Sequence, residues 1–299
     1  MMELLRRITQ IFGFVISHAY LRVIATKQIY QGPLKATCIP FVTCHACPAA
    51  VFSCPLGTIQ HYMVIRQIPY VLLGHLGILL VAVGRMACGW LCPVGLFQDL
   101  MYKIKSVKIK IPHRLDYFKY ATLLGLVVLI PYLHGEAWFC KLCPPGTLEA
   151  AIPWVLWNPI NLEFQQPTVD IATIGLLFFI KIAILVGFVI FIVISKRPFC
   201  RVLCPLGLIF SIFNRFSLIR MKVENASKCS DKCNLCLKDC PMEIKIYEDP
   251  NSSECIRCLK CTKCKKVKVG IGNLSESVLP AKRLPKTVPG VMSGKQETP

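Results

Sequence analysis

The longest apolar stretch, IATIGLLFFIKIAILVGFVIFIVIS at residues 171–195, constrains the fold more than any other feature. A helix of about 20 apolar residues crosses a hydrocarbon core of roughly 30 Å. Stretches 8–26, 62–84 and 117–137 have a similar character. Hydrophobic residues make up 54% of the 299 residues and the mean hydropathy is +0.54, which is rare in soluble domains of this length. We therefore predict a mainly α integral membrane protein with a four-helix transmembrane bundle.

The distribution of charge predicts the orientation of these spans. The formal net charge is +19, and basic residues gather in the 85–119 loop and directly after residue 195, whereas 138–170 is poor in them. The positive-inside rule places both termini and the 85–119 loop in the cytoplasm. Loops 27–61 and 138–170 then lie outside the cell membrane. Because this pattern accounts for the basic charge, we expect a lipid membrane and no nucleic acid as a partner.

Two similar cysteine pairs, in CGWLCPVG at 88–95 and CRVLCPLG at 200–207, each follow an apolar stretch. Four cysteine thiolates complete a 4Fe–4S cluster, so neither pair suffices alone. The pairs predict one cluster shared at the inner membrane face, with ligands Cys88, Cys92, Cys200 and Cys204. The alternative is that each pair consists of buried, inert thiols.

Cys-Pro-x-Gly units begin at Cys54, Cys92, Cys143 and Cys204, and they alternate between the two predicted faces. The spans therefore form two parallel two-helix repeats, which are expected to pack around an axis along the membrane normal. Proline is favoured at the first position of a helix, so each cysteine is predicted at a helix start. The N–H groups and dipole there favour an anionic cluster, and glycine permits close approach of the backbone.

The outer face has more cysteines than one cluster needs. Repeat symmetry predicts an outer cluster with ligands Cys47, Cys54, Cys140 and Cys143. Cys38 and Cys44 would then form a disulfide or belong to another ligation scheme. Alternatively, one cluster is enclosed by the first loop alone, through Cys38, Cys44, Cys47 and Cys54.

Residues 229–264 contain two cysteine runs, C-x3-C-x2-C-x3-C-P and C-x2-C-x2-C-x2-C. In two-cluster ferredoxins the fourth cysteine of each run binds the other run's cluster. The predicted ligands are Cys229, Cys233, Cys236 and Cys264 for one cluster, and Cys240, Cys255, Cys258 and Cys261 for the other. Zinc ribbons are the alternative. We expect a membrane domain at 1–220, a cytoplasmic ferredoxin-like α+β domain at 221–266, and a mostly disordered tail at 267–299.

Three polar residues within the spans are further candidates for cofactor binding. His18 and His75 lie at similar predicted depth, where they would ligate a haem or contact a quinone. The alternative is that both are bundle histidines whose hydrogen bonds are satisfied by neighbouring groups. Lys181 lies near the middle of the last span, where it would pair with an anionic cluster or headgroup, or reach to the outer surface.

The motifs CGWLCPVG and FCRVLCPLG with the terminal double cysteine run resemble the polyferredoxin-like membrane 4Fe-4S binding proteins. This family includes the membrane iron–sulfur subunit of periplasmic nitrate reductase systems (NapH type) and the membrane domain of the nitrous-oxide-reductase accessory flavoprotein (NosR type). The resemblance covers roughly residues 60–265. It implies electron transfer between the quinone pool or a cytoplasmic ferredoxin and an extracytoplasmic partner. The cysteine-rich outer loops depart from the nitrate-system pattern and favour a path through the membrane.

Three functions follow from these features. The leading one is an electron carrier between cytoplasmic ferredoxin-type clusters and an outer cluster or redox partner, acting as a component of an oxidoreductase system. Its cytoplasmic partner would be a ferredoxin or reductase. The second is a quinol dehydrogenase or quinone reductase subunit that uses the inner clusters. The third is a redox sensor or assembly scaffold.

Overall fold

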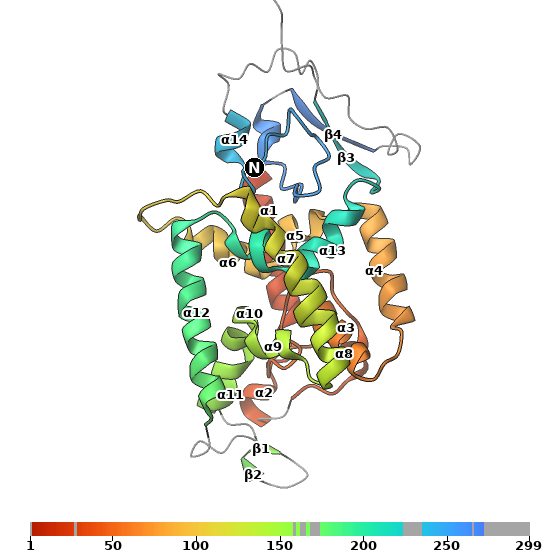
Figure 1. Cartoon of the computed structure of the whole chain (residues 1–299), viewed down its shortest axis with the longest axis vertical. Helices are drawn as coiled ribbons and strands as arrows, with labels where there is room; N and C mark the ends of the chain where they lie inside the picture. Colours follow the sequence, from red (N-terminus) through yellow and green to blue (C-terminus); the bar gives the residue numbers. More distant parts are fainter. Residues whose placement is uncertain are drawn as a thin grey trace, which may run out of the picture.

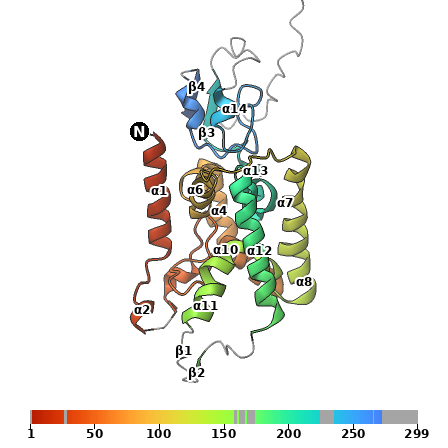
Figure 2. The same ribbon diagram turned by 90° about the vertical axis from the view of Figure 1, so that its left-hand side faces the viewer.

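The structure is a computed structural model that describes residues 2–26, 29–157, 160–161, 166–167, 174–223, 235–264 and 266–271. These residues form a mostly helical body and a smaller body that contains strands β3 and β4 (Figure 1). The smaller body lies at one end of the helical body, on the side where the N-terminus is found (Figures 1 and 2).

The helical body consists of long outer helices and short inner ones. Its α-helices are α1 (Met2–Ser17), α2 (Val23–Thr26), α3 (Pro55–Val64), α4 (Tyr70–Val83), α5 (Met86–Trp90), α6 (Pro93–Met101), α7 (Phe118–Ala121), α8 (Ile130–His134), α9 (Trp138–Leu142), α10 (Pro144–Gly146), α11 (Ile152–Trp157), α12 (Leu176–Ile194) and α13 (Pro205–Phe213). Thr122–Leu129, Thr147–Ala151 and Phe199–Leu203 are π-helical, and Pro33–Ala36 and His113–Tyr117 are 3-10 turns. A short hairpin pairs β1 (Ile160–Asn161) with β2 (Gln166–Pro167).

Among the described residues, two helices are long and apolar enough to cross a membrane. They are Arg114–His134, which contains α7 and α8, and α12 (Leu176–Ile194). They correspond to the expected third and fourth spans. The structure therefore supports two of the spans, and the complete four-helix transmembrane bundle stays a prediction.

The first two predicted spans differ from expectation. Helix α1 ends at Ser17, and the expected span 8–26 continues only as the single turn α2. The expected span 62–84 is broken, because α3 ends at Val64 and α4 starts after Pro69. Proline disfavours the helical conformation of the residue that precedes it, which explains the break before Pro69. Helix α4 has 14 residues, about 21 Å of helical rise.

Helix α1 buries its polar face and exposes its apolar one. Its buried residues are Arg6, Gln10, Gly13 and Ser17. The exposed side chains include Leu4, Leu5, Ile8, Ile11, Phe12 and Val15. A surface helix in water has the opposite arrangement, whereas polar side chains of membrane helices face the bundle interior. The pattern on α1 therefore favours membrane association, as do the two long apolar helices.

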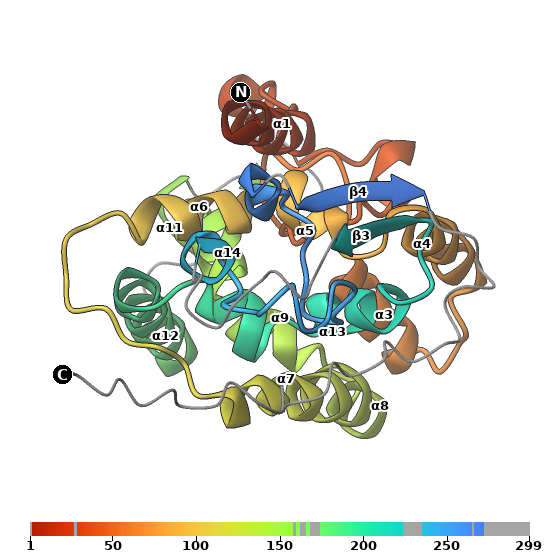
Figure 3. The same cartoon turned by 90° about the horizontal axis from the view of Figure 1, so that it is seen from above.

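The short helices lie inside the ring of long ones. Figures 1 and 2 show α6 and α13 toward the smaller body and α10 toward the opposite end. Seen from above, α9 and α13 lie between α12 and α4 (Figure 3). The chain thus enters the bundle from both ends, which brings the motif cysteines inward from the two faces.

The smaller body is built on one antiparallel ribbon, in which β3 (Ile219–Val223) pairs with β4 (Val267–Ile271). It also contains α14 (Leu235–Asp239) and a 3-10 turn at Lys260–Lys263. Strand β3 begins before the expected boundary at 221, and β4 lies after the one at 266. The division at 221–266 and the disordered tail at 267–299 stay predictions, and residues after Ile271 lie outside the described ranges.

Polar contacts fix the smaller body to the helical one. Trp90 Nε1 donates to the carbonyl oxygen of Arg257 at 3.0 Å. Glu254 accepts from Arg85 Nη1 at 2.8 Å and also from Lys119 Nζ. The side chains of both cations are only 1% exposed. Because an unpaired buried charge is costly, the contacts hold the two bodies in one orientation.

Candidate metal centres

Each Cys-Pro-x-Gly cysteine stands immediately before a helix. Cys54, Cys92, Cys143 and Cys204 have extended backbones and precede α3, α6, α10 and α13, each with proline as the next residue. The sulfur therefore lies beside N–H groups that have no partner within the helix. At Cys204, Sγ accepts from the backbone N–H of Gly207 at 3.3 Å. The helix starts lie where the Cys-Pro motifs predict them.

The structure brings the two inner cysteine pairs together. All four predicted inner ligands line a single cavity. The other side chains around it are Phe41, Val42, Arg85, Phe199 and Leu206. Cys92, Cys200 and Cys204 are 5–7% exposed, so the cavity is shielded from solvent. The cavity thus takes cysteines from both halves of the chain and has few other polar groups.

Two buried arginines cross between the halves at this cavity, and sequence reasoning missed both. Arg85 Nη2 donates to the carbonyl oxygen of Cys200 at 2.9 Å, and Arg197 Nη1 donates to that of Cys88 at 3.4 Å. They are 0% and 1% exposed. Each arginine stands three residues before the first cysteine of its own inner pair and reaches the other half of the chain. That repeated Arg-x-x-Cys spacing was the available signal.

The arginines also explain the motif glycines at the inner site. A Cβ on Gly207 would lie 3.1 Å from Arg85 Nη2, and one on Gly95 would lie 3.3 Å from Arg197 Nη1. The expected role of these glycines was approach of the backbone to the cluster. The structure shows in addition that they make room for the guanidinium groups, which supply positive charge beside four thiols.

A second group of cysteines lies on the other side of the bundle interior. Cys140 Sγ is 3.7 Å from the position of a Cβ on Gly57, the glycine of the Cys54 motif. Cys44 Sγ is 3.6 Å from the corresponding position on Gly146. Cys143 lies close to three other cysteines, Cys140, Cys44 and Cys54. These four cysteines form the outer group, and the predicted fourth ligand, Cys47, is not among them.

Cys47 faces a different feature. Its side chain contacts His18, and both residues line an apolar cavity of about 450 Å³ between α1, α6 and α12. His18 Nε2 lies 3.6 Å from Glu149 Oε2 at the edge of this cavity. Cys38 lies apart from these groups, with its sulfur 3.1 Å from Thr58 Oγ1.

The other two candidate residues in the spans are not brought to this cavity. His75 lies on the exposed side of α4, so the structure does not pair it with His18. A haem held by both histidines therefore has no geometric support. Lys181 is half-buried on α12, and its predicted pairing with a cluster or headgroup stays a prediction.

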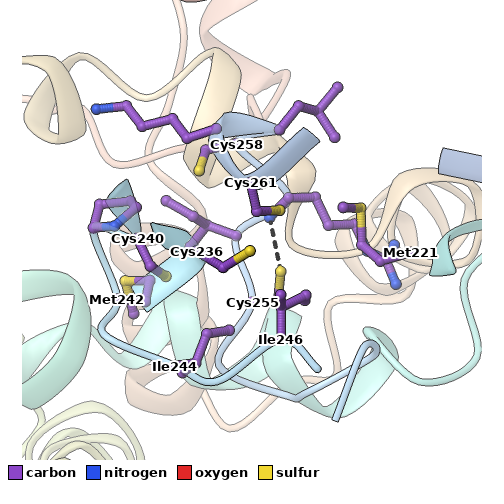
Figure 4. A pocket seen from close by; sticks show the side chains of 14 residues that line it. Met221, Cys236, Cys240, Met242, Ile244, Ile246, Cys255, Cys258 and Cys261 are labelled. Carbon is purple, nitrogen blue, oxygen red and sulfur yellow. Dashed lines mark hydrogen bonds between the residues drawn. The ribbon is translucent and has the colours of Figure 1, made fainter. Parts of the chain in front are cut away.

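The smaller body holds a third group of cysteines. Cys236 lines a cavity together with the four predicted ligands of one ferredoxin-type cluster, Cys240, Cys255, Cys258 and Cys261 (Figure 4). Burial, together with the charges of neighbouring thiols, raises the pKa of Cys255 and of Cys261 to about 12. Cys264 and Cys236 both pack against the apolar cluster that contains Cys255. Cys229 and Cys233 lie outside the described residues.

The third group lies against the inner group. Cys88 and Cys200 share one packed apolar cluster with Cys240 and Cys258. A Cβ on Gly89 would overlap the carbonyl oxygen of Ile256, so glycine is required where the two bodies meet. The predicted ligands of the inner cluster and of one ferredoxin-type cluster therefore belong to the same packed group of side chains.

One short segment connects the inner and outer groups. Phe41 and Val42 line the inner cavity, and the Val42 backbone N–H lies beside the Cys92 thiol. The next N–H, that of Thr43, lies beside the Cys54 thiol. The segment 41–44 therefore touches both groups through consecutive residues.

These cysteine groups fit iron–sulfur clusters in their donor chemistry. Within the ranges that the structure describes, no three His, Cys, Asp or Glu side chains are grouped closely enough for a single metal ion. The inner cysteines and those of the smaller body instead line cavities, and backbone N–H groups donate to Cys204 Sγ and Cys255 Sγ. N–H donors and cations stabilise the negative charge of thiolate-bound clusters.

A 4Fe-4S binding domain model matches residues 67–112, 120–156 and 177–224. An uncharacterized protein of Methanocaldococcus jannaschii is 35% identical over 190 residues, which cover 60% of this chain and 68% of that protein. The ferredoxin-type protein NapH of Haemophilus influenzae is 27% identical over 82% of this chain and 76% of its own length. The methylamine utilization ferredoxin-type protein MauN of Methylobacillus flagellatus is 24% identical, and the match spans 48% of it. No solved structure matches.

The fold and the three cysteine groups define an iron–sulfur protein with apolar helices typical of membrane association. Its relatives include the regulatory protein NosR of Stutzerimonas stutzeri and the putative electron transport protein YccM of Escherichia coli. The chain belongs to the polyferredoxin-like 4Fe-4S electron-transfer protein family. The resemblance inferred from the cysteine motifs is thereby confirmed.

Proposed function

We propose that this chain carries electrons through the membrane between the cytoplasmic ferredoxin-like body and an extracytoplasmic redox partner. Each 4Fe–4S cluster would supply one-electron uptake and release. The inner cluster would be held by Cys88, Cys92, Cys200 and Cys204. The outer cluster would be held by Cys44, Cys54, Cys140 and Cys143. The ferredoxin-like body would hold two more, as its spacing predicts, with a cytoplasmic ferredoxin or reductase as partner.

The contacts between neighbouring cysteine groups carry this proposal. The ferredoxin-like body packs its Cys240 and Cys258 against Cys88 and Cys200, and residues 41–44 connect the inner group to the outer one. A row of close sites is what a path through the membrane requires. Arg85 and Arg197 favour the more negative, reduced state at the inner site, since positive charge stabilises added negative charge.

Reconstitution in sealed lipid vesicles tests the proposal. An impermeant reductant is added on the side of the ferredoxin-like body, and reduction of an acceptor trapped inside is followed. We expect transfer in quinone-free vesicles for the native chain and none for a chain in which Cys200 and Cys204 are replaced by alanine. Clusters without any transfer would contradict the carrier and favour the sensor or scaffold.

A quinone-linked enzyme subunit is the second candidate, and the apolar cavity beside His18 favours it. The cavity has room for a ring-sized group, and His18 and Glu149 supply polar groups at its edge. In the same vesicles this function requires an added quinol to reduce the clusters. The carrier needs no quinol, so the two functions give opposite results.

A further inference from the structure

Gln60 and Gln98 make the same set of contacts at the outer and inner sites. Each stands six residues after a motif cysteine, in CPLGTIQ and CPVGLFQ. Both are 0% exposed. Gln60 Nε2 lies 3.0 Å from Cys140 Sγ, and Gln98 Nε2 lies 3.3 Å from Cys200 Sγ. Each glutamine thus extends from a first-half motif to the first cysteine of the second-half pair.

The remaining contacts fix the orientation of each amide. Gln60 Oε1 accepts from the Phe139 backbone N–H at 3.1 Å, and Gln98 Oε1 accepts from that of Phe199 at 3.1 Å. Each Nε2 also donates to the carbonyl oxygen four residues earlier, at 3.2 Å. A backbone N–H only donates and a carbonyl only accepts, so the amide oxygen cannot exchange places with the nitrogen. The second N–H of each amide is therefore directed at a cysteine sulfur.

We propose that Gln60 and Gln98 are positioning residues that hold a cluster ligand and raise the reduction potential of its cluster. This inference rests on the proposed function. An N–H donor to a ligand sulfur stabilises the extra negative charge of the reduced cluster, and hydrogen bonds to sulfur are among the factors that set cluster potentials. The amide oxygen also accepts a hydrogen bond from the backbone N–H of the residue before the cysteine. This bond fixes the position of the sulfur relative to the first half of the chain.

Gln10 provides a matched control for the inner site. It is also 0% exposed, but its Nε2 donates to the carbonyl oxygens of Gly89 and Cys92, at 3.2 and 3.4 Å, and to no sulfur. The substitutions Gln98→Met and Gln10→Met remove the same amide from the same neighbourhood. They differ in the contact with Cys200 Sγ and in the hydrogen bond that Gln98 Oε1 accepts from the Phe199 N–H, both of which hold the second-half pair.

The experiment is a potentiometric titration of the purified holoprotein followed by EPR. We expect Gln98→Met to shift the inner cluster to a lower midpoint potential and Gln10→Met to leave it unchanged. Gln60→Met should shift only the outer cluster. Loss of the inner cluster in Gln98→Met alone would also support the inference, because it shows that the amide holds Cys200.

An unchanged potential in Gln98→Met with the cluster retained would overturn the inference. Equal loss of the cluster in Gln98→Met and Gln10→Met would overturn it as well. The loss of any buried amide, rather than the loss of the sulfur contact, would then explain the missing cluster. Failure of the proposed function looks different: the native chain would then have no cluster signal that depends on Cys200 and Cys204.

Discussion

Replacing Cys200 and Cys204 together with alanine is expected to remove about four iron and four sulfide from a native complement of about 16 each. The second half then contributes no thiolate to the inner cavity, and the two remaining cysteines cannot hold a cubane cluster. Iron and acid-labile sulfide are measured on anaerobically purified, monodisperse protein. The signals of the ferredoxin-like body should remain.

Cys38→Ala is the control for this loss. Cys38 is buried, like the ligands, but its sulfur faces Thr58 rather than any of the three cysteine groups. We expect this variant to keep its full iron content. A double variant that retains all its iron, or native protein loaded with zinc, would be incompatible with a shared cluster.

Cys44→Ala and Cys47→Ala are expected to differ by one whole cluster, although the two cysteines are three residues apart. Cys44 lies against Gly146 of the Cys143 motif, whereas Cys47 contacts His18. Alanine at 44 should therefore remove the outer cluster, and alanine at 47 should leave about 16 iron per chain. EPR and iron analysis measure both variants. The opposite result would restore the ligand set predicted from repeat symmetry.

The inner site was predictable because its geometry is local to each motif. Cys-Pro fixes a helix start, and two similar pairs at equivalent places must meet if the halves pack symmetrically. The motifs thus predict that Cys88, Cys92, Cys200 and Cys204 form one group, and the structure places all four around one cavity. The family resemblance rested on the same motifs.

The outer site was harder to predict, because the conformation of a loop decides it. Thr37 and Ser53 are joined by a backbone hydrogen bond of 3.1 Å, which closes the loop and lets residues 41–44 lie inside the bundle. Neither periodicity nor spacing indicates that closure. The choice between Cys44 and Cys47 therefore required the structure.

The roles of the arginines and glutamines were missed for a different reason. Arg85 and Arg197 were interpreted as surface charge that sets the topology, because charged residues are almost never fully buried unless paired. They are paired here, since Arg197 binds Asp99 at 2.8 Å and Arg85 binds Glu254 at 2.8 Å. In the sequence, both arginines share an Arg-x-x-Cys spacing to the first cysteine of a pair, but Arg201 has the same spacing to Cys204, so the pattern alone does not single them out.

The most direct test of the through-membrane path is the EPR spectrum of the fully reduced protein. Two Cα steps from Val42 to Cys44 span at most about 7 Å, so clusters at the inner and outer sites would be close neighbours. We predict a signal broadened by spin–spin interaction that becomes simpler when Cys44→Ala removes the outer cluster. A native spectrum that is the plain sum of independent clusters, unchanged in form by that loss, would contradict the account.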